Sequence, residues 1–220
     1  ESWLHRGQLA RRLSLLTEAR DALEAWILLP RGADEPDSTQ VQVHLAAADV
    51  CLRQDDLAAA EGHYKAVLRR DPNVAEAYFN MGFIATRFGR PDQAVRFYEA
   101  TVQLDPDMPQ AHYLLGRLYA DQKDLERGTA SLLRAVKLDP TLAEAYERLA
   151  YLHAVDGKHL ERAREFALKS VELQPASTAA LNTLSWIFYL LGDYSPAEEA
   201  VLEALRLAPD SAAYRQGLEA

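Results

Sequence analysis

The chain has 220 residues, of which 49% are hydrophobic and 26% charged, and its formal net charge is −9. This composition is that of an ordinary folded protein and excludes an intrinsically disordered chain. The acidic balance argues against nucleic acid as a partner, because phosphate-binding surfaces carry clustered Lys and Arg. No apolar run approaches the roughly 20 residues of a membrane-spanning helix, so no membrane insertion is expected. The single cysteine, Cys51, excludes an internal disulfide and a Cys-rich metal site.

Prolines recur along the chain at an almost constant interval. They stand 34, 34, 35 and 34 residues apart, at Pro72, Pro106, Pro140, Pro175 and Pro209. Such a period indicates stacked structural repeats. Proline disfavours helical geometry in the residue before it and has no N–H, so each one is expected to end a unit.

The N-terminal residues 1–30 are predicted to be a degenerate copy of the repeat that ends at Pro30. Three of its residues keep the spacing of the aromatic, glycine and alanine positions: Trp3, Gly7 and Ala19. A polar loop is expected over 31–40, where the sequence reads RGADEPDS. Regular units follow over 41–74, 75–108, 109–142, 143–177 with one inserted residue, and 178–211. A capping helix is expected over 212–220.

Each regular unit is predicted to be a helix, a turn and a second helix. Small residues occupy its eighth position (Ala48, Gly82, Gly116, Ala150, Ser185) and its twentieth (Ala60, Ala94, Gly128, Ala163, Ala197). Two helices are therefore expected to touch at these positions. Between them stand Gly89, Gly157 and Gly192, which can adopt the left-handed conformation that stops a helix.

These positions resemble the tetratricopeptide repeat, a helix-turn-helix of 34 residues. In the repeat over 75–108 the matching residues are Tyr78, Met81, Gly82, Ala94, Tyr98 and Pro106. The resemblance implies an all-α fold, a right-handed α-solenoid of helix-turn-helix repeats. Arginine-rich composition and the segment LNTLSWIFYLLGDYSPAEEAVLEALRLAPDS are similar to bacterial envelope-assembly and secretion-associated members of the family.

The resemblance also implies a concave groove lined by the first helices, where family members bind a peptide or helix of another protein. The expected groove residues are Phe79, Asn80, Phe83, Arg87, Tyr113, Arg117, Arg148, Tyr151, Asn182, Trp186 and Tyr189. Aromatic residues and arginine are enriched at binding hot spots. The structural alternative is that Phe79 and Tyr113 only fill gaps between adjacent helices.

No motif of an enzyme is present: the sequence has no HExxH, no CxxC and no phosphate-binding loop. We therefore expect a non-catalytic interaction scaffold without metal or cofactor, possible in either the cytoplasm or the periplasm, in a bacterial envelope, secretion or pilus assembly. The alternative is the targeting or regulatory segment of a larger enzyme, such as a glycosyltransferase or kinase. The chain starts at Glu1 rather than Met, which is expected of a processed product or of a piece of a longer protein. Self-association into a homo-oligomer is a third alternative.

Overall fold

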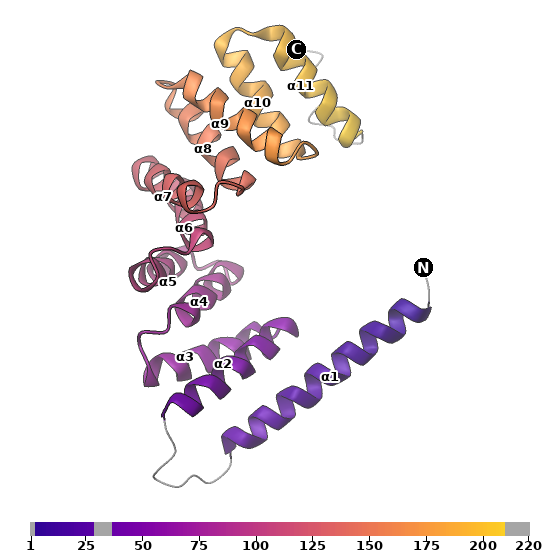
Figure 1. Cartoon of the computed structure of the whole chain (residues 1–220), viewed down its shortest axis with the longest axis vertical. Coiled ribbons are helices and arrows are strands. Elements are labelled where there is room, and N and C mark those ends of the chain that lie inside the picture. Colours follow the sequence, from indigo (N-terminus) through magenta and orange to yellow (C-terminus); the bar gives the residue numbers. More distant parts are fainter. Residues whose placement is uncertain (1–2, 29–36, 210–220) are drawn as a thin grey trace. The chain divides into compact units, whose positions relative to one another are not determined.

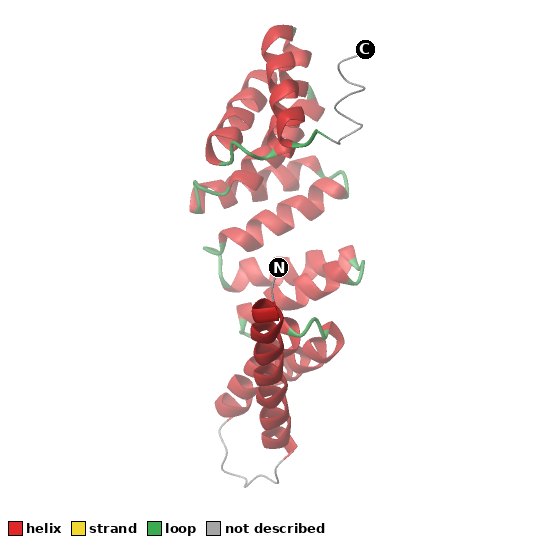
Figure 2. Cartoon of the chain, turned by 90° about the vertical axis from the view of Figure 1, so that its right-hand side faces the viewer, coloured by secondary structure: helices red, strands yellow, loops and turns green. Residues whose placement is uncertain are grey.

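A computed structural model of the chain describes residues 3–28 and 37–209, and all regular secondary structure in these ranges is helical (Figures 1 and 2). The predicted all-α class and helix-turn-helix repeat are confirmed. The predicted capping helix over 212–220 lies outside the described residues. The helices are α1 (Trp3–Leu28), α2 (Asp37–Arg53), α3 (Leu57–Arg70), α4 (Ala75–Arg87), α5 (Pro91–Leu104), α6 (Pro109–Asp121), α7 (Leu125–Leu138), α8 (Ala143–Asp156), α9 (Leu160–Leu173), α10 (Thr178–Leu191) and α11 (Tyr194–Leu207).

Consecutive helices from α2 onward pack as pairs, α2 with α3 through to α10 with α11. The chain forms two compact units, residues 1–106 and 107–220. Helices α1 to α5 belong to unit 1, and α6 to α11 belong to unit 2. No described helix is both long enough and apolar enough to span a bilayer.

The N-terminal segment differs from its prediction. Residues 3–28 form one continuous helix rather than a degenerate helix-turn-helix, so the prediction for 1–30 is wrong there. The segment has no proline or glycine after Gly7 until its end and is rich in Leu, Ala, Arg and Glu, which propagate helix. Residues 37–40, assigned to the loop, open α2 instead, and its first residues, Asp-Ser-Thr, are of the types favoured at a helix start.

Arg20 links helix α1 to the turn between α2 and α3 of the same unit. Its guanidinium donates hydrogen bonds to Glu24 Oε1 at 2.7 Å, to Asp56 Oδ2 at 2.8 Å and to Gln54 Oε1 at 3.3 Å. Asp56 also caps α3 by accepting from the Ala59 N–H at 3.0 Å. The hydrogen bond from the Ala59 N–H is the main cause that lowers the pKa of Asp56, and the one from Arg20 is the next. The cap and the attachment of α1 therefore share one carboxylate.

The turns inside the repeats use the left-handed conformation. The prediction is confirmed at Gly89, Gly157 and Gly192, whose φ angles are 66°, 70° and 83°. In the other two repeats a residue other than glycine takes this turn position: Asp55, with a φ angle of 59°, and Lys123, with a φ angle of 64°. An L-residue in this conformation is strained, because its Cβ crowds the backbone.

Lys123→Gly is therefore expected to raise the free energy of unfolding by about 1 kcal/mol, because it removes that crowding. The measurement is urea unfolding followed by circular dichroism. Gly157→Ala is the matched control: nothing lies within 4 Å of its added Cβ, so an expected loss of about 1–2 kcal/mol reports backbone strain alone. If both variants shift stability in the same direction, the strain argument fails.

The two helices of a repeat approach each other closely at small residues. In unit 2 a Cβ on Gly116 would lie 3.0 Å from the carbonyl oxygen of Gly128, and a Cβ on Gly128 would lie 3.2 Å from that of Gly116. In unit 1 a Cβ on Gly82 would lie 2.7 Å from the ring of Tyr98. The predicted contact between the eighth and twentieth positions is thus present at Gly116 and Gly128.

Candidate functional site

All the predicted groove residues lie on first helices of the pairs. Helix α4 carries Phe79, Asn80, Phe83 and Arg87, α6 carries Tyr113 and Arg117, α8 carries Arg148 and Tyr151, and α10 carries Asn182, Trp186 and Tyr189. The α4 residues belong to unit 1 and the others to unit 2.

Most of the α4 residues are engaged inside unit 1. Phe79 packs edge-on against the buried ring of Tyr98, with centroids 5.7 Å apart, and the Asn80 amide donates to the Glu76 carbonyl of its own helix at 3.0 Å. Arg87 forms an ion pair with Asp55 at 3.0 Å. The structural alternative thus describes Phe79 well, and the most exposed apolar side chain of this group is Phe83.

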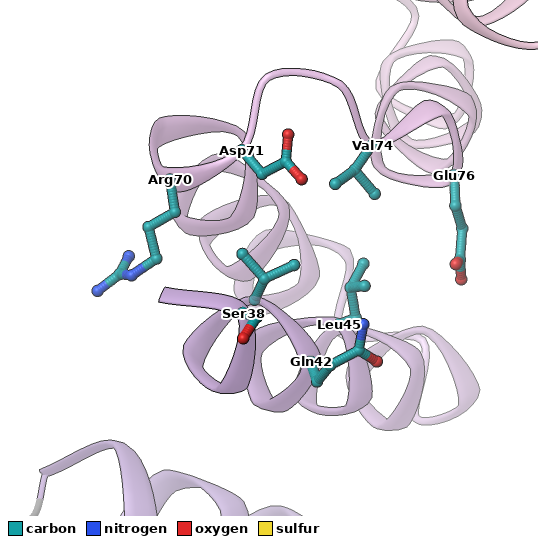
Figure 3. A pocket seen from close by; sticks show the side chains of 8 residues that line it. Ser38, Gln42, Leu45, Arg70, Asp71, Val74 and Glu76 are labelled. Atoms are coloured by element: carbon teal, nitrogen blue, oxygen red, sulfur yellow. The ribbon is translucent and has the colours of Figure 1, made fainter. Parts of the chain in front are cut away.

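A hollow of about 450 Å³ in unit 1 lies between α2 and the turn that leads from α3 into α4 (Figure 3). Leu45 and Val74 line it from the two sides. Arg70, at its edge, donates to Gln40 Oε1 at 2.7 Å and to the Ala66 carbonyl at 3.1 Å, and in Figure 3 its guanidinium points away from Asp71. This hollow therefore offers a small apolar surface. The guanidinium of Arg70 beside it already has hydrogen-bond partners within unit 1.

Two of the hollows in unit 2 lie on opposite sides of α8, and we together call them the α8 groove. The first, of about 480 Å³, is lined by Ala120, Asp121, Lys123, Leu125, Arg148, Tyr151, Leu152 and Val155. The second, of about 600 Å³, is lined by Glu147, Arg148, Tyr151, Val155, Ala179, Asn182, Thr183 and Trp186. Arg148, Tyr151 and Val155 line both hollows, so one face of α8 forms the centre of this surface.

Four exposed aromatic residues continue this surface along α10 and into α11, and we call them the aromatic strip. Tyr151 and Trp186 have ring centroids 5.7 Å apart at 40°, and Tyr189 and Tyr194 have centroids 5.7 Å apart at 65°. Trp186 and Tyr189 are three residues apart on α10, which makes them neighbours on one helix face. Their exposed fractions are 41% for Tyr151, 36% for Trp186, 64% for Tyr189 and 66% for Tyr194.

The strip stands on a buried core that holds α8 and α10 in place. Leu149 and Leu152 of α8 are buried in the cluster shared with α7. Ile187, next to Trp186 on α10, is buried with residues of α8 and α9. Ser177 caps α10 by accepting from the Ala180 N–H at 3.2 Å. Exposed rings on well-packed helices form a preorganised surface, which lowers the entropic cost of binding.

Some polar side chains at the α8 groove have hydrogen-bond partners among the described residues and others have none. Glu147 accepts a hydrogen bond from the Thr183 hydroxyl at 3.0 Å, and Arg117 lies over the Tyr113 ring at 5.9 Å. Arg148 and Asn182 make no ion pair or side-chain hydrogen bond with any residue that the structure describes. An unpaired guanidinium and an unpaired amide at one hollow are free to bind a ligand.

The described residues contain no group of three His, Cys, Asp or Glu side chains placed to hold a metal ion. Cys51 is buried, and burial raises the pKa of its thiol, which is the opposite of what activates a nucleophile. His44 is buried as well, and its Nδ1 lies 3.1 Å from that of His63.

Two histidines give the fold a dependence on pH. Burial lowers the pKa of His63 and of His153 below the ordinary 6.5. The unfolded chain therefore takes up protons first as pH falls, so the stability contributed by neutral imidazoles is complete above pH 6.5 and is lost below it. Glu24, Asp56 and Arg20 act on His63, while Arg162, His159 and Asp156 act on His153.

We expect the free energy of unfolding to decrease as pH is lowered from neutrality through 6.5. The His63→Gln, His153→Gln double variant should show a flatter profile. Urea unfolding at a series of pH values measures both. An unchanged slope in the double variant would assign the pH dependence to other groups.

The predicted groove residues leave out Val155, Thr183 and Tyr194. Val155 stands at the thirteenth position of its repeat and Thr183 at the sixth, and both are among the first-helix positions that family members use for the groove, so the spacing could have found them. Tyr194 lies on a second helix, outside those positions. The contacts of Thr183 with Glu147 and of Tyr194 with Tyr189 arise only in the folded chain.

Comparison of the sequence with protein families finds the tetratricopeptide repeat over residues 45–109, 81–143 and 178–211, which is more than half of the chain. A search of curated proteins gives no match.

Comparison with solved structures finds many similar chains. A crystal structure of MamA has a TM-score of 0.67 at 26% identity, over 73% of this chain and 93% of that one. YrrB, described as a TPR protein with an unusual peptide-binding site, has a TM-score of 0.73 at 18% identity, over 86% of this chain and 100% of that one. PilF of Pseudomonas aeruginosa has a TM-score of 0.68 at 18% identity, over 82% of each chain.

Proposed function

Because this chain belongs to the tetratricopeptide repeat family, we propose that it is a non-catalytic scaffold that binds a peptide or helix of a partner protein in the α8 groove. The observation that carries the proposal is the aromatic strip beside the unpaired Arg148. Exposed Tyr and Trp next to Arg form the composition typical of binding hot spots.

The geometry of the hollows supports a polypeptide ligand. The first hollow lies between α8 and the turn from α6 into α7, the second lies between α8 and α10, and both open to solvent. Packed helices lie on the order of 8–10 Å apart, so the hollows are separated by about three residues of an extended chain at roughly 3.3 Å per residue. One short segment that crosses α8 therefore reaches both.

The remaining predicted residues take a lesser part in this proposal. Arg117 and Tyr113 lie on α6, whose last residues Ala120 and Asp121 line the first hollow. Phe83 gives unit 1 a separate apolar contact. Asn80 and Arg87 already have partners inside unit 1, so we assign them to the fold rather than to the partner.

Two solved structures of similar fold support the proposal, one for the class of function and one for its cellular setting. YrrB is a protein of this fold whose structure is described as having a peptide-binding site, and we carry that mode of binding over to this chain. We place the scaffold in a bacterial envelope, secretion or pilus assembly, on the strength of its composition, its C-terminal repeat segment and its similarity in fold to PilF.

Site-specific photo-crosslinking in cells of the source organism tests the proposal. A benzophenone amino acid at Ala179, which lines the second hollow, is expected to crosslink a partner protein that mass spectrometry identifies. The same amino acid at Leu168, exposed on α9, is the matched control and should not. The crosslink from Ala179 should also disappear in a Trp186→Ala background.

Crosslinking of a partner from Leu168 and not from Ala179 would move the binding surface to the second helices. No crosslink from Ala179 at all would contradict the proposal that this hollow is occupied.

A further inference from the structure

We infer that the α8 groove binds a proline-rich segment of its partner in the polyproline II conformation. The inference rests on the proposed function and specifies the chemistry of the ligand. It follows from the hydrogen-bonding groups that surround the strip and from the kind of surface that the rings present.

Hydrogen-bond donors predominate among the free groups of the second hollow. Arg148 offers five N–H donors, the Asn182 amide two and the Trp186 indole one, and none of the three makes a side-chain hydrogen bond with a described residue. These donors outnumber the acceptors of the same hollow, which include the side-chain carbonyl oxygen of Asn182 and the carboxylate of Glu147, one oxygen of which already accepts from Thr183. The surface therefore fits a ligand rich in acceptors and poor in donors.

A proline-rich segment is such a ligand. Proline has a carbonyl but no N–H, and a polyproline II helix has no internal hydrogen bonds, so its carbonyls remain available. An amphipathic helix bonds most of its own carbonyls internally and could offer Arg148 and Asn182 only side-chain acceptors. An acidic segment would also meet Arg148, but it would be repelled by Glu147 and Asp121, which line the same hollows.

The aromatic strip supplies the other half of the complementarity. Tyr151 and Trp186 are tilted by 40° rather than stacked flat, and both rings remain more than a third exposed. Proline rings dock on such aromatic surfaces in recognition of polyproline II segments, and the rigidity of the segment keeps the entropic cost of binding low. Tyr189 and Tyr194 extend the same kind of surface beyond the hollow.

Fluorescence anisotropy with dye-labelled peptides tests the inference on the full chain. The probe is a repeated Ala-Pro-Pro peptide of about 12 residues, four turns of polyproline II. It is compared with an amphipathic helical peptide and a Glu-rich extended peptide of the same length. We expect binding of the Ala-Pro-Pro peptide, weakened roughly tenfold or more by Trp186→Ala and by Arg148→Ala.

Leu168→Ala is the matched control, because Leu168 is an exposed apolar side chain that lies on α9 and lines neither hollow. It should leave peptide affinity unchanged. Circular dichroism spectra that match the wild type show that a loss of binding in the other variants is not a loss of folding. Equal affinity of all variants, or no binding of the Ala-Pro-Pro peptide, overturns the inference.

Selection from a random peptide library separates the two proposals. Enrichment of proline-rich peptides that require Trp186 supports both. Enrichment of helical or acidic peptides that require Trp186 overturns the polyproline inference and leaves the peptide-binding scaffold intact. If no enriched peptide depends on Trp186, the proposed function at this groove fails as well.

Discussion

Gly116→Leu is expected to lower the free energy of unfolding by about 1–3 kcal/mol or more, as overpacking does in a dense core. A Cβ at this position would lie 2.8 Å from Leu132 Cγ, 3.0 Å from the Gly128 carbonyl oxygen and 3.1 Å from the Leu132 backbone nitrogen. Two of these atoms belong to the backbone of α7, and the Leu132 side chain is fully buried. The conflict can be relieved only by moving α6 and α7 apart, which opens the core between them.

Gly62→Ala is the matched control for this variant. Gly62 is exposed within α3, and nothing lies within 4 Å of an added Cβ. Alanine is the better helix former, so this variant should gain roughly 0.5–1 kcal/mol. Thermal and urea unfolding measure both. Equal stability of the Gly116 variant and the wild type would mean that α6 and α7 do not approach as closely as the structure has them.

Trp186→Ala is expected to weaken binding of the partner by about 2 kcal/mol or more, the effect typical of an aromatic hot spot. Trp186 lies against Tyr151 at the opening of the second hollow, and more than a third of it is exposed. Its removal deletes contact area for the partner and leaves the buried layer formed by Leu184 and Ile187 in place. Isothermal titration with the crosslinked partner or its peptide measures the loss.

Leu149→Ala provides the contrast on α8. Leu149 is completely buried beside the exposed Tyr151, so its truncation should cost about 2–5 kcal/mol of unfolding free energy. Trp186→Ala should cost much less stability. If the two variants lose the same stability, the division of these helices into a core face and a binding face is wrong.

Much of the fold follows from local sequence signals. The proline interval, the turn glycines and the small residues at Gly116 and Gly128 predict where helices end and where two of them touch, because each acts through backbone geometry or the size of one side chain. The sequence is less informative where such a signal is missing. Residues 3–28 contain no proline, and no glycine after Gly7, that would mark a turn, and the resemblance to a degenerate repeat led to the wrong prediction for α1.

The left-handed turns show the same limit. Glycine marks three of them. Asp55 is of a type that adopts this conformation more often than most residues with a side chain, whereas Lys123 is not. At these two turns α2 packs on α3 and α6 packs on α7. Contacts distributed over both helices therefore offset the backbone strain of the turn.

The sequence by itself determined the repeat and its period, and through the family resemblance it predicted which side chains of the first helices face the groove. Only the tertiary structure decided which of them remain free. Arg87 is taken up by Asp55, 32 residues away, and Glu147 by Thr183, 36 residues away, while Arg148 and Trp186 are left to solvent. Such pairings join different repeats, so they depend on how neighbouring helices pack and carry no signal in the spacing of residues along the chain.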